Sequence, residues 1–352
     1  MRVLIFGGTG AMGKPTVDLL TCEGHEVYVT TRKNLISDDK YIHYICGDAK
    51  DMAFVKSLLK SHYDVLIDFM VYTTKELSER IDILLDGADQ YIFLSSSRVY
   101  ADVNGKITES SPRLLDVCVD KEYISTDEYA LAKAREEDVI RSTGKKNFTI
   151  LRPYVTVNDH CIKLGVYEKE HWLRRALAGR TIVFPKDIAN SKTCLTYGND
   201  VAASIVGLIH NEKAYGEVFH VTTDEVHSWD EILNMYLDAI EKETGHRPKV
   251  KYATNSDGLQ TVWNKWQIIY DRLFDRKFDN SKIESACGDI NYHSTLETIN
   301  LCIHGFLQNP KWNSIDGKFE AWCDRQCGEW TPLKEISGKK NKLIYLKYRI
   351  FG

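Results

Sequence analysis

Residues 7–13 read "GGTGAMG" and directly follow the apolar run "RVLIF" at residues 2–6. Glycine recurs at every third position of this stretch, at Gly7, Gly10 and Gly13. Between a strand and a helix, glycine allows a tight turn, close approach of the backbone to a pyrophosphate, and close helix–strand packing. The start of the helix also offers free N–H groups and the positive end of its dipole to a phosphate. The stretch therefore predicts a dinucleotide site at the first strand-to-helix junction.

Short apolar strands and amphipathic helices alternate from this junction onward. We expect further strands at 26–30, 42–46, 64–71, 91–94 and 148–152, and helices at 14–22, 51–61 and 75–85, with a long polar helix before the sixth strand. Nearly continuous apolar strands separated by helices are typical of a parallel sheet covered on both faces. Together with the right-handed crossover rule, they predict an α/β fold with a doubly wound parallel Rossmann sheet.

The second half of the chain is less regular, with expected helices near 229–243 and 295–307. We expect a Rossmann dinucleotide-binding domain over 1–155. A smaller, mostly C-terminal substrate-binding lobe should follow over 156–338, with 193–222 returning to the Rossmann core.

The composition is ordinary for a soluble globular protein. The 352 residues are 43% hydrophobic and 27% charged, and the net charge of -4 gives no support for nucleic-acid binding. Nine scattered cysteines, no secretory leader pattern and no apolar run of ~18–20 residues predict a cytoplasmic protein with free thiols. Cys323 and Cys327 have helix-face spacing without a second ligand pair, so we expect no metal site.

The end of the expected second strand bears on the choice of dinucleotide. An NAD site usually has an acidic residue there for the ribose 2′-hydroxyl, whereas this chain has Thr31, Arg32 and Lys33. A hydroxyl and a guanidinium suit a 2′-phosphate, so NADP(H) is favoured, and NAD(H) stays open because Arg32 can also be a solvated loop charge. Asp48 is placed to reach the adenine edge, and it can at the same time cap the next helix. The expected cofactor-binding residues are Gly7, Thr9, Gly10, Ala11, Met12, Gly13, Thr31, Arg32, Asp48 and Ala49.

Tyr129 and Lys133 lie four residues apart in "DEYALAKAREEDVI", residues 127–140. On a helix they share one face, one turn from each other. A free tyrosine has a pKa near ~10 and is a poor base at neutral pH. A lysine cation one turn away favours the phenolate, which makes a phenol able to act as a general acid or base on a sugar hydroxyl or carbonyl. By itself the spacing fits an ordinary surface helix equally well.

A serine run, "SSSRVY" at residues 95–100, closes the fifth expected strand. With the glycine loop before it and Y-x-x-x-K after it, the chain resembles the extended short-chain dehydrogenase/reductase family, which includes nucleotide-sugar epimerases, dehydratases and reductases. The resemblance runs to about residue 222 and includes "LRP" (151–153), "GRTIVFP" (179–185) and "GNDVA" (198–202), with a further segment, "FDNSKI" (278–283).

The resemblance implies a catalytic set of Ser96, Tyr129 and Lys133. Ser96 is expected to donate a hydrogen bond to the reacting oxygen, and Tyr129 to exchange a proton with it. Lys133 is expected to bind the nicotinamide ribose and to favour the ionised phenol. The substrate-binding residues are expected to include Ser97, Lys192 and Arg272, with Arg174, Arg175 and Arg180 as further candidates.

Departures from the family pattern reduce the number of family reactions that we expect of this chain. Family dehydratases place Asp-Glu directly after the catalytic Ser or Thr, whereas Ser97 and Arg98 stand here, so dehydration is not expected. Many epimerases have asparagine where this chain has Val155. We expect NADPH-dependent carbonyl reduction of a nucleotide-activated sugar or related polyol precursor. The alternative is a nucleotide-sugar epimerase with tightly bound NAD.

A third hypothesis is RNA binding. Through "TTRK" (30–33), "YIFLSSSRVY" (91–100) and "ALAGRTIVFP" (176–185), the chain also resembles an atypical branch of the family that contains plant chloroplast RNA-binding proteins. That branch commonly lacks Y-x-x-x-K, which is intact here. RNA binding is therefore the least favoured of the three.

The last fourteen residues, 339–352, form a basic amphipathic tail with five basic residues and no acidic one. Such a segment can lie on an anionic membrane surface or dock on the protein body, and docking is favoured. The family resemblance further implies a homodimer formed through two long helices.

Overall fold

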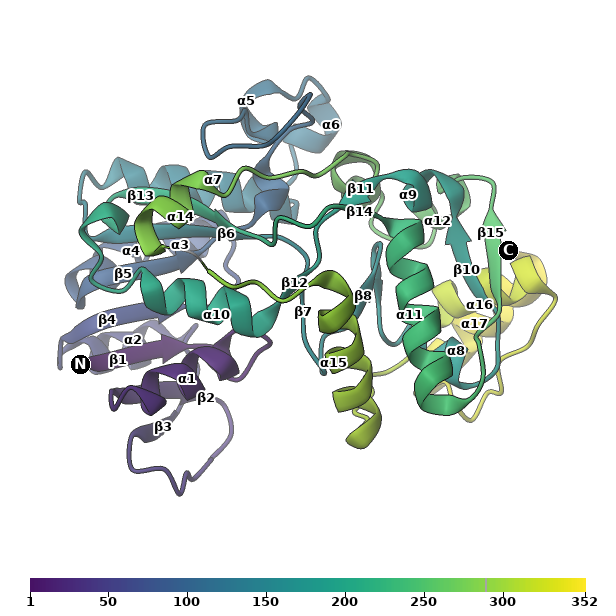
Figure 1. The fold of residues 1–352 in the computed structure, drawn as a ribbon, viewed down its shortest axis with the longest axis horizontal. Helices are drawn as coiled ribbons and strands as arrows, with labels where there is room; N and C mark the ends of the chain where they lie inside the picture. The colour runs from purple at the N-terminus through teal and green to yellow at the C-terminus, as the bar shows by residue number, and fades with distance from the viewer. Residues whose placement is uncertain (289) are drawn as a thin grey trace. The chain divides into compact units, whose positions relative to one another are not determined.

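A seven-stranded parallel sheet forms the centre of the first of two structural units (Figure 1). The computed structural model describes residues 1–288 and 290–352. The strands of the sheet are β1 (Arg2–Phe6), β2 (Glu26–Thr31), β3 (Ile42–Cys46), β4 (Tyr63–Asp68), β5 (Ala88–Leu94), β6 (Phe148–Pro153) and β13 (Glu217–Val221). Their order is β13-β6-β5-β4-β1-β2-β3, and every neighbouring pair is parallel. The predicted doubly wound α/β fold is confirmed.

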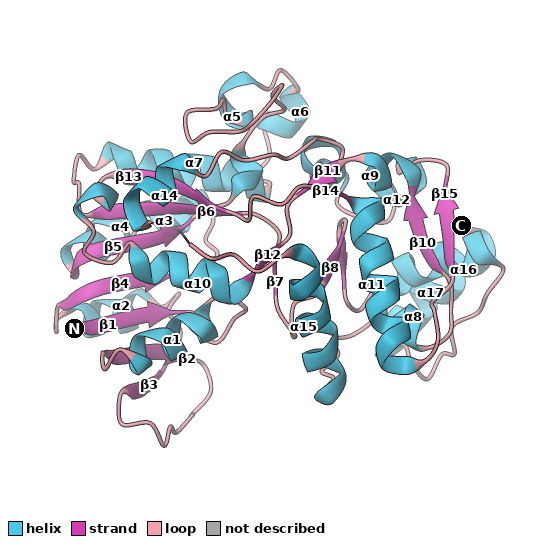
Figure 2. Ribbon diagram, viewed as in Figure 1, coloured by secondary structure: helices cyan, strands magenta, loops and turns pink. Residues whose placement is uncertain are grey.

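Helices cover both faces of this sheet (Figure 2). Alternate residues of β1 enter separate cores: Val3 and Ile5 pack on one face, and Leu4 and Phe6 on the other. The first face is covered by α1 (Gly13–Cys22), α10 (Gly198–Gly207) and α14 (Ser281–Cys287). The second is covered by α2 (Met52–Leu59), α3 (Thr74–Ser78), α4 (Ile81–Asp86) and α7 (Tyr129–Ser142). Burial on both faces explains why the strands are apolar throughout.

The expected helix over 75–85 is wrong in one respect, because two short helices, α3 and α4, replace it. The chain turns at Arg80, whose side chain is buried. Its guanidinium donates to the carbonyls of Glu76 (2.7 Å), Ala49 (3.1 Å) and Lys50 (3.2 Å). These bonds tie the turn to the segment that follows β3.

Polar side chains hold the far edge of the sheet, where β6 lies between β5 and β13. The buried Gln90 amide donates to Thr149 Oγ1 and to the Leu208 carbonyl, both at 2.9 Å. Its oxygen accepts the His210 N–H at 2.7 Å. Thr149 in turn donates to the Ala214 carbonyl at 2.9 Å. The segment over 208–214 therefore satisfies polar groups of two strands.

The first unit comprises Met1–Thr156, Leu195–Asp224 and Phe278–His293, and the second comprises Val157–Cys194, Glu225–Lys277 and Ser294–Gly352. The remaining elements of the first unit are η1 (Ser97–Val99), α5 (Leu114–Val117), α6 (Lys121–Ile124), β12 (Thr196–Tyr197) and η2 (Glu212–Ala214). Strand β7 (Thr156–Val157) has its first residue in the first unit and its second in the second unit. The second unit contains β8 (Lys163–Leu164), β9 (Tyr167–Glu168), α8 (Leu173–Leu177), β10 (Ile182–Pro185), α9 (Lys186–Asn190), β11 (Lys192–Thr193), β14 (His227–Ser228), α11 (Trp229–Thr244), β15 (Val250–Ala253), α12 (Asp257–Gln260), α13 (Lys265–Gln267), η3 (Ile268–Arg272), α15 (Thr295–Gln308), α16 (Gly317–Cys327) and α17 (Lys339–Phe351).

A buried ion-pair network holds the second unit together around Arg175, which is 1% exposed. Its guanidinium lies 2.6 Å from Glu320 Oε1, 2.8 Å from Asp324 Oδ1 and 3.0 Å from Glu329 Oε2. The Tyr345 hydroxyl of α17 donates to Asp324 Oδ2 at 2.7 Å. The network joins α8, α16 and α17, so it gives Arg175 a structural role.

The basic tail forms α17, which packs on α16. Tyr345 is buried with Ala321 and Ile336, whereas Ile350 and Phe351 are 57% and 83% exposed. Among the helices within 1–288 and 290–352, none is long and apolar enough to span a bilayer.

Candidate dinucleotide and catalytic site

The glycine loop joins β1 to α1 at the point where the strand order reverses, between β1 and β4. In doubly wound folds, ligands bind at the carboxyl ends of the strands at this point. Gly7 has a φ of +74°, which favours glycine. A Cβ on Gly13 would lie 2.7 Å from backbone atoms of Gly8. No side chain caps the start of α1 at Met12, so its first N–H groups face the loop without a side-chain acceptor from that residue.

Gly13→Ala is expected to lower the free energy of unfolding by about 1–3 kcal/mol, because the new methyl group meets backbone that cannot rotate away. Gly10→Ala is the matched control, since its Cβ would meet nothing closer than the Gly7 carbonyl oxygen at 3.8 Å. Urea unfolding of both variants without nucleotide checks this. Equal stability of the two would contradict the close packing of the loop on α1.

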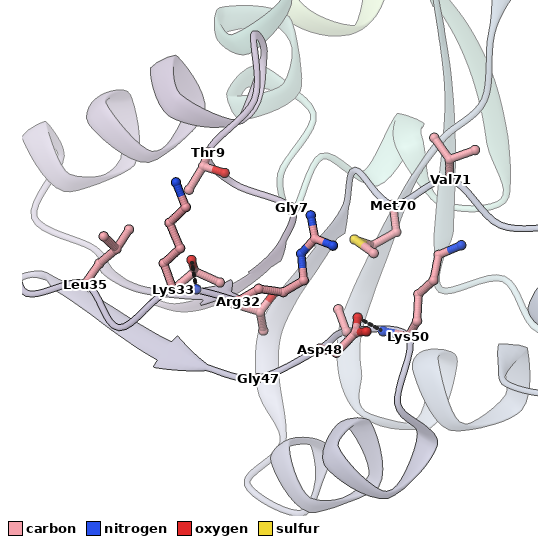
Figure 3. A pocket seen from close by; sticks show the side chains of 13 residues that line it. Gly7, Thr9, Arg32, Lys33, Leu35, Gly47, Asp48, Lys50, Met70 and Val71 are labelled. Carbon is pink, nitrogen blue, oxygen red and sulfur yellow. Dashed lines mark hydrogen bonds between the residues drawn. The ribbon is translucent and has the colours of Figure 1, made fainter. Parts of the chain in front are cut away.

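A cavity of about 740 Å³ opens beside this loop (Figure 3). It is lined by Gly7, Thr9, Thr30, Thr31, Arg32, Lys33, Leu35, Gly47, Asp48, Ala49, Lys50, Met70 and Val71. These residues lie at or just after the carboxyl ends of β1, β2, β3 and β4. In Figure 3 the charged ends of Arg32 and Lys33 extend from β2 toward the loop that carries Gly7 and Thr9. The cavity has the size of a small-molecule site.

Six of the ten residues predicted to bind the cofactor line this cavity: Gly7, Thr9, Thr31, Arg32, Asp48 and Ala49. The other four, Gly10, Ala11, Met12 and Gly13, lie in the loop and at the start of α1. Lys50, Met70 and Val71 also line the cavity and are not among the residues that the sequence predicted. Their positions just after β3 and β4 are the signal that could have found them, because strand ends meet at this edge.

The sequence predicts two roles for Asp48, contact with the adenine edge and capping of α2. The structure gives the capping role to another residue. The cap of α2 is Asp51, whose Oδ1 accepts the N–H groups of Ala53 (2.7 Å) and Phe54 (3.1 Å). Asp48 accepts the Lys50 N–H at 2.9 Å within the turn before it. The helix-cap role predicted for Asp48 is therefore wrong, and Asp48 lines the cavity.

Each serine after β5 has a different environment. Ser95 donates to Glu137 Oε1 at 2.5 Å, and Ser97 donates to the Arg152 carbonyl at 2.6 Å. Ser96 accepts the Arg98 N–H at 3.2 Å as the cap of η1. Two of the hydroxyl protons are thus used inside the fold. Among the described residues, Ser96 differs from its neighbours in accepting a hydrogen bond there, whereas Ser97 has a packing role.

Tyr129 begins α7 and is half-buried. Two cations lie near its ring: the Arg98 guanidinium carbon is 5.4 Å from the ring centroid, and Lys133 Nζ is 6.0 Å from it. Helix α7 packs on η1, which carries Arg98. The structure thus brings Tyr129 and Lys133 together on one helix face, beside the segment that Ser96 caps.

Lys133 is 1% exposed, and its Nζ lies 2.9 Å from Oε2 of the fully buried Glu136. Burial raises the pKa of Glu136 to about 7, against the attraction of Lys133. Asp68, at the end of β4, is also fully buried, and burial raises its pKa. The hydroxyls of Tyr72 and Tyr91 each donate to Asp68 Oδ2 at 3.0 Å. Neither carboxyl is predicted from the sequence, although Glu136 stands three residues after Lys133.

The two predicted substrate residues of the second unit differ in exposure. Lys192 is exposed on β11, and its backbone N–H donates to Asp275 Oδ1 at 2.8 Å. Arg272 is buried, pairs with Asp271 and donates from Nε to the Gly165 carbonyl at 2.8 Å. The Arg272 guanidinium therefore has partners within its own unit. Over residues 1–288 and 290–352 there is no cluster of side chains suited to a metal ion.

Residues 3–221 match the NAD dependent epimerase/dehydratase family, and the chain belongs to that family. Among proteins of known sequence, it is 28% identical over 245 residues to "Chloroplast stem-loop binding protein of 41 kDa b" of Arabidopsis thaliana. That match covers 65% of this chain and 60% of the plant protein.

Two solved structures show the shared fold. One is the Bordetella bronchiseptica enzyme WbmH in complex with NAD+, with a TM-score of 0.67, 14% identity, and coverage of 88% of this chain and 99% of that chain. The other is UDP-glucuronic acid 4-epimerase from Bacillus cereus in complex with UDP-glucuronic acid and NAD, with a TM-score of 0.66, 16% identity and the same coverage.

Proposed function

We propose that the protein is an NADP(H)-dependent oxidoreductase that reduces a carbonyl of a nucleotide-activated sugar or related polyol precursor. The observation that carries this proposal is the rim of the cavity at the end of β2. Thr31, Arg32 and Lys33 line it, and no carboxylate stands at that strand end. A 2′-phosphate is a dianion that a guanidinium and a hydroxyl bind well, whereas a bare ribose is usually held by an acidic residue.

The residues around the cavity fit a dinucleotide in three parts. The glycine loop and the first N–H groups of α1 suit the pyrophosphate. Arg32, Lys33 and Thr31 suit the 2′-phosphate. Asp48 and Ala49, after β3, are expected to meet the adenine edge. The nicotinamide supplies the hydride chemistry when it is bound.

The chain's own residues provide the proton chemistry. The Ser96 hydroxyl donates a hydrogen bond to the substrate oxygen, and Tyr129 Oη donates the proton that this oxygen needs. Ser97 and Arg98 occupy the places of the dehydratase acids, so the site lacks that pair for elimination. The nucleotide-sugar class is supported by the shared fold with an epimerase bound to UDP-glucuronic acid. Homodimer formation, membrane contact through α17 and a cytoplasmic location remain predictions.

Arg32→Ala is expected to weaken NADPH binding by about 10–100-fold, because a charge-assisted hydrogen bond contributes roughly 1.5–3 kcal/mol. NADH binding serves as the internal control and should change little. Fluorescence titration of both nucleotides on both proteins checks this. Equal loss for NADH and NADPH would contradict a 2′-phosphate role for Arg32.

Mass spectrometry of nucleotide released from freshly purified protein separates the proposal from its alternative. Near-stoichiometric NAD would favour an epimerase that keeps its cofactor. An empty protein that prefers NADPH would favour the reductase. Failure to bind either nucleotide would contradict both.

A second candidate function is RNA binding, which the similarity to the chloroplast stem-loop binding protein favours. The net charge of -4 weighs against it. Salt-dependent binding of a stem-loop RNA at about 150 mM salt, together with no nucleotide binding, would support this candidate over the first.

A further inference from the structure

Helix α17 is buried along one side and exposed along the other. We propose that the exposed side binds the surface of an anionic lipid bilayer. This inference goes beyond the proposed function, because α17 carries no residue of the dinucleotide or catalytic site. We call the exposed side the outer face of α17, and it consists of Lys339, Lys340, Leu343, Lys347, Ile350 and Phe351.

The geometry of the helix gathers these six residues into one stripe. Successive residues of an α-helix are about 100° apart, which places all six within a sector of roughly 120°. The opposite side carries Tyr345, which is 1% exposed and packs with Ala321 and Ile336. The Tyr345 hydroxyl donates to the buried Asp324 at 2.7 Å. Docking through Tyr345 therefore holds the helix on its own unit and leaves the outer face in contact with solvent.

Large apolar side chains stand out from this surface. Leu343, Ile350 and Phe351 are 68%, 57% and 83% exposed. Trp330, which is 54% exposed, lies beside the helix, with the Arg349 guanidinium carbon 4.3 Å from its ring centroid. Exposed apolar side chains that gather in one place mark an interaction surface. Leucine, phenylalanine and tryptophan beside lysine and arginine are typical of helices that lie in the interface of a bilayer.

The charge of this region fits an anionic surface. Residues 330–352 include six basic residues and one acidic residue, in a chain whose net charge is -4. The acidic residue, Glu335, pairs with Arg180 at 2.7 Å. An anionic bilayer therefore attracts this end of the chain and repels the net negative remainder, which orients the protein. The lysine stems can lie along apolar surface while their ammonium groups reach lipid phosphates.

Other occupants match only part of the outer face. A second copy bound through the same face would bring the lysines of both copies into one interface, where like charges repel. A nucleic acid would match the lysines but would leave Leu343, Ile350 and Phe351 without an apolar partner. A bilayer of anionic lipids offers both phosphate groups and hydrocarbon.

Co-sedimentation of the full-length protein with lipid vesicles tests the proposal. At about 150 mM salt we expect binding to vesicles of equal parts phosphatidylserine and phosphatidylcholine, and little binding to phosphatidylcholine alone. The triple variant Lys339→Gln, Lys340→Gln, Lys347→Gln should lower the affinity for the anionic vesicles on the order of 100-fold, because each lysine near such a surface contributes about fivefold. Absence of binding by the wild-type protein would overturn the proposal.

The matched control is the triple variant Lys242→Gln, Lys249→Gln, Lys311→Gln. It removes the same charge from exposed lysines of the second unit that lie outside α17. Its affinity for the anionic vesicles should stay close to that of the wild type. Equal losses in the two triple variants would overturn the proposal, because the total charge and not the outer face would then govern binding.

A second variant tests the apolar side chains. Leu343→Ser with Ile350→Ser leaves every lysine in place and changes only exposed positions, so the fold should be retained. We expect about tenfold weaker vesicle binding, because the apolar groups no longer enter the bilayer interface. Unchanged vesicle binding would overturn the proposal. Binding of a stem-loop RNA, lost in the Lys339, Lys340 and Lys347 variant and without vesicle binding by the wild type, would assign the outer face to nucleic acid instead.

Discussion

Tyr129→Phe is expected to lower turnover by about 10²–10⁴-fold, because the substrate oxygen loses its proton donor. Nucleotide binding should be unchanged, since Tyr129 does not line the cavity beside the glycine loop. The measurement is NADPH oxidation with a panel of keto-sugar nucleotides, together with a fluorescence titration of NADPH. Loss of turnover with intact binding is the expected pattern.

Tyr215→Phe is a suitable control for this variant. It removes a tyrosine hydroxyl from the same unit, where it bonds to His210 Nδ1 at 3.1 Å. Its turnover should remain near that of the wild type. If Tyr129→Phe also keeps near-wild-type turnover, Tyr129 has no part in the proton transfer.

Arg175→Met is expected to destabilise the second unit by about 3–5 kcal/mol, because it leaves buried carboxylates without their counter-charge. Glu320, Asp324 and Glu329 would lose their shared partner. All seven tryptophans of the chain lie in this unit, at residues 172, 229, 263, 266, 312, 322 and 330. Tryptophan fluorescence during urea unfolding therefore reports on the second unit alone.

Arg174→Met provides the neighbouring control. Arg174 is half-buried, and its guanidinium lies 5.4 Å from the centroid of the Trp312 ring. Methionine retains much of that apolar contact, so the loss should stay below about 1 kcal/mol. A similar unfolding midpoint for the two variants would show that the buried network does not stabilise the unit.

The glycine loop and the strands around it could be predicted from the sequence, because short local patterns determine them. The glycine spacing and the apolar strands each depend on neighbouring residues, and β1 and β3 have the expected bounds. Strand β4 begins one residue earlier than expected, at Tyr63, and its larger difference is at its end. It stops at Asp68 rather than running to residue 71, because the Asp68 carboxylate accepts the Met70 N–H at 2.9 Å and turns the chain.

Long-range pairing could not be predicted in the same way. Arg175 meets partners about 145–154 residues later in the chain, and nothing in "LRRAL" distinguishes it from a substrate-binding arginine. Glu136 stands in "KAREED", which reads as a polar surface helix. Only the tertiary structure shows that this turn of α7 faces the interior. Burial, and not residue type, distinguishes Arg175 and Glu136 from the solvated charges that the sequence suggests.

The strand order of the central sheet has a consequence for synthesis on the ribosome. Strand β13, which covers β6, is separated from it by roughly 60 residues of the chain. At about 5–20 residues per second, β6 emerges several seconds before its neighbour. During that interval its backbone edge is open, and the Gln90 and Thr149 side chains lack the carbonyls of Leu208 and Ala214. An open apolar edge invites pairing with other nascent chains. The newly made chain therefore exposes this edge to aggregation until β13 has emerged.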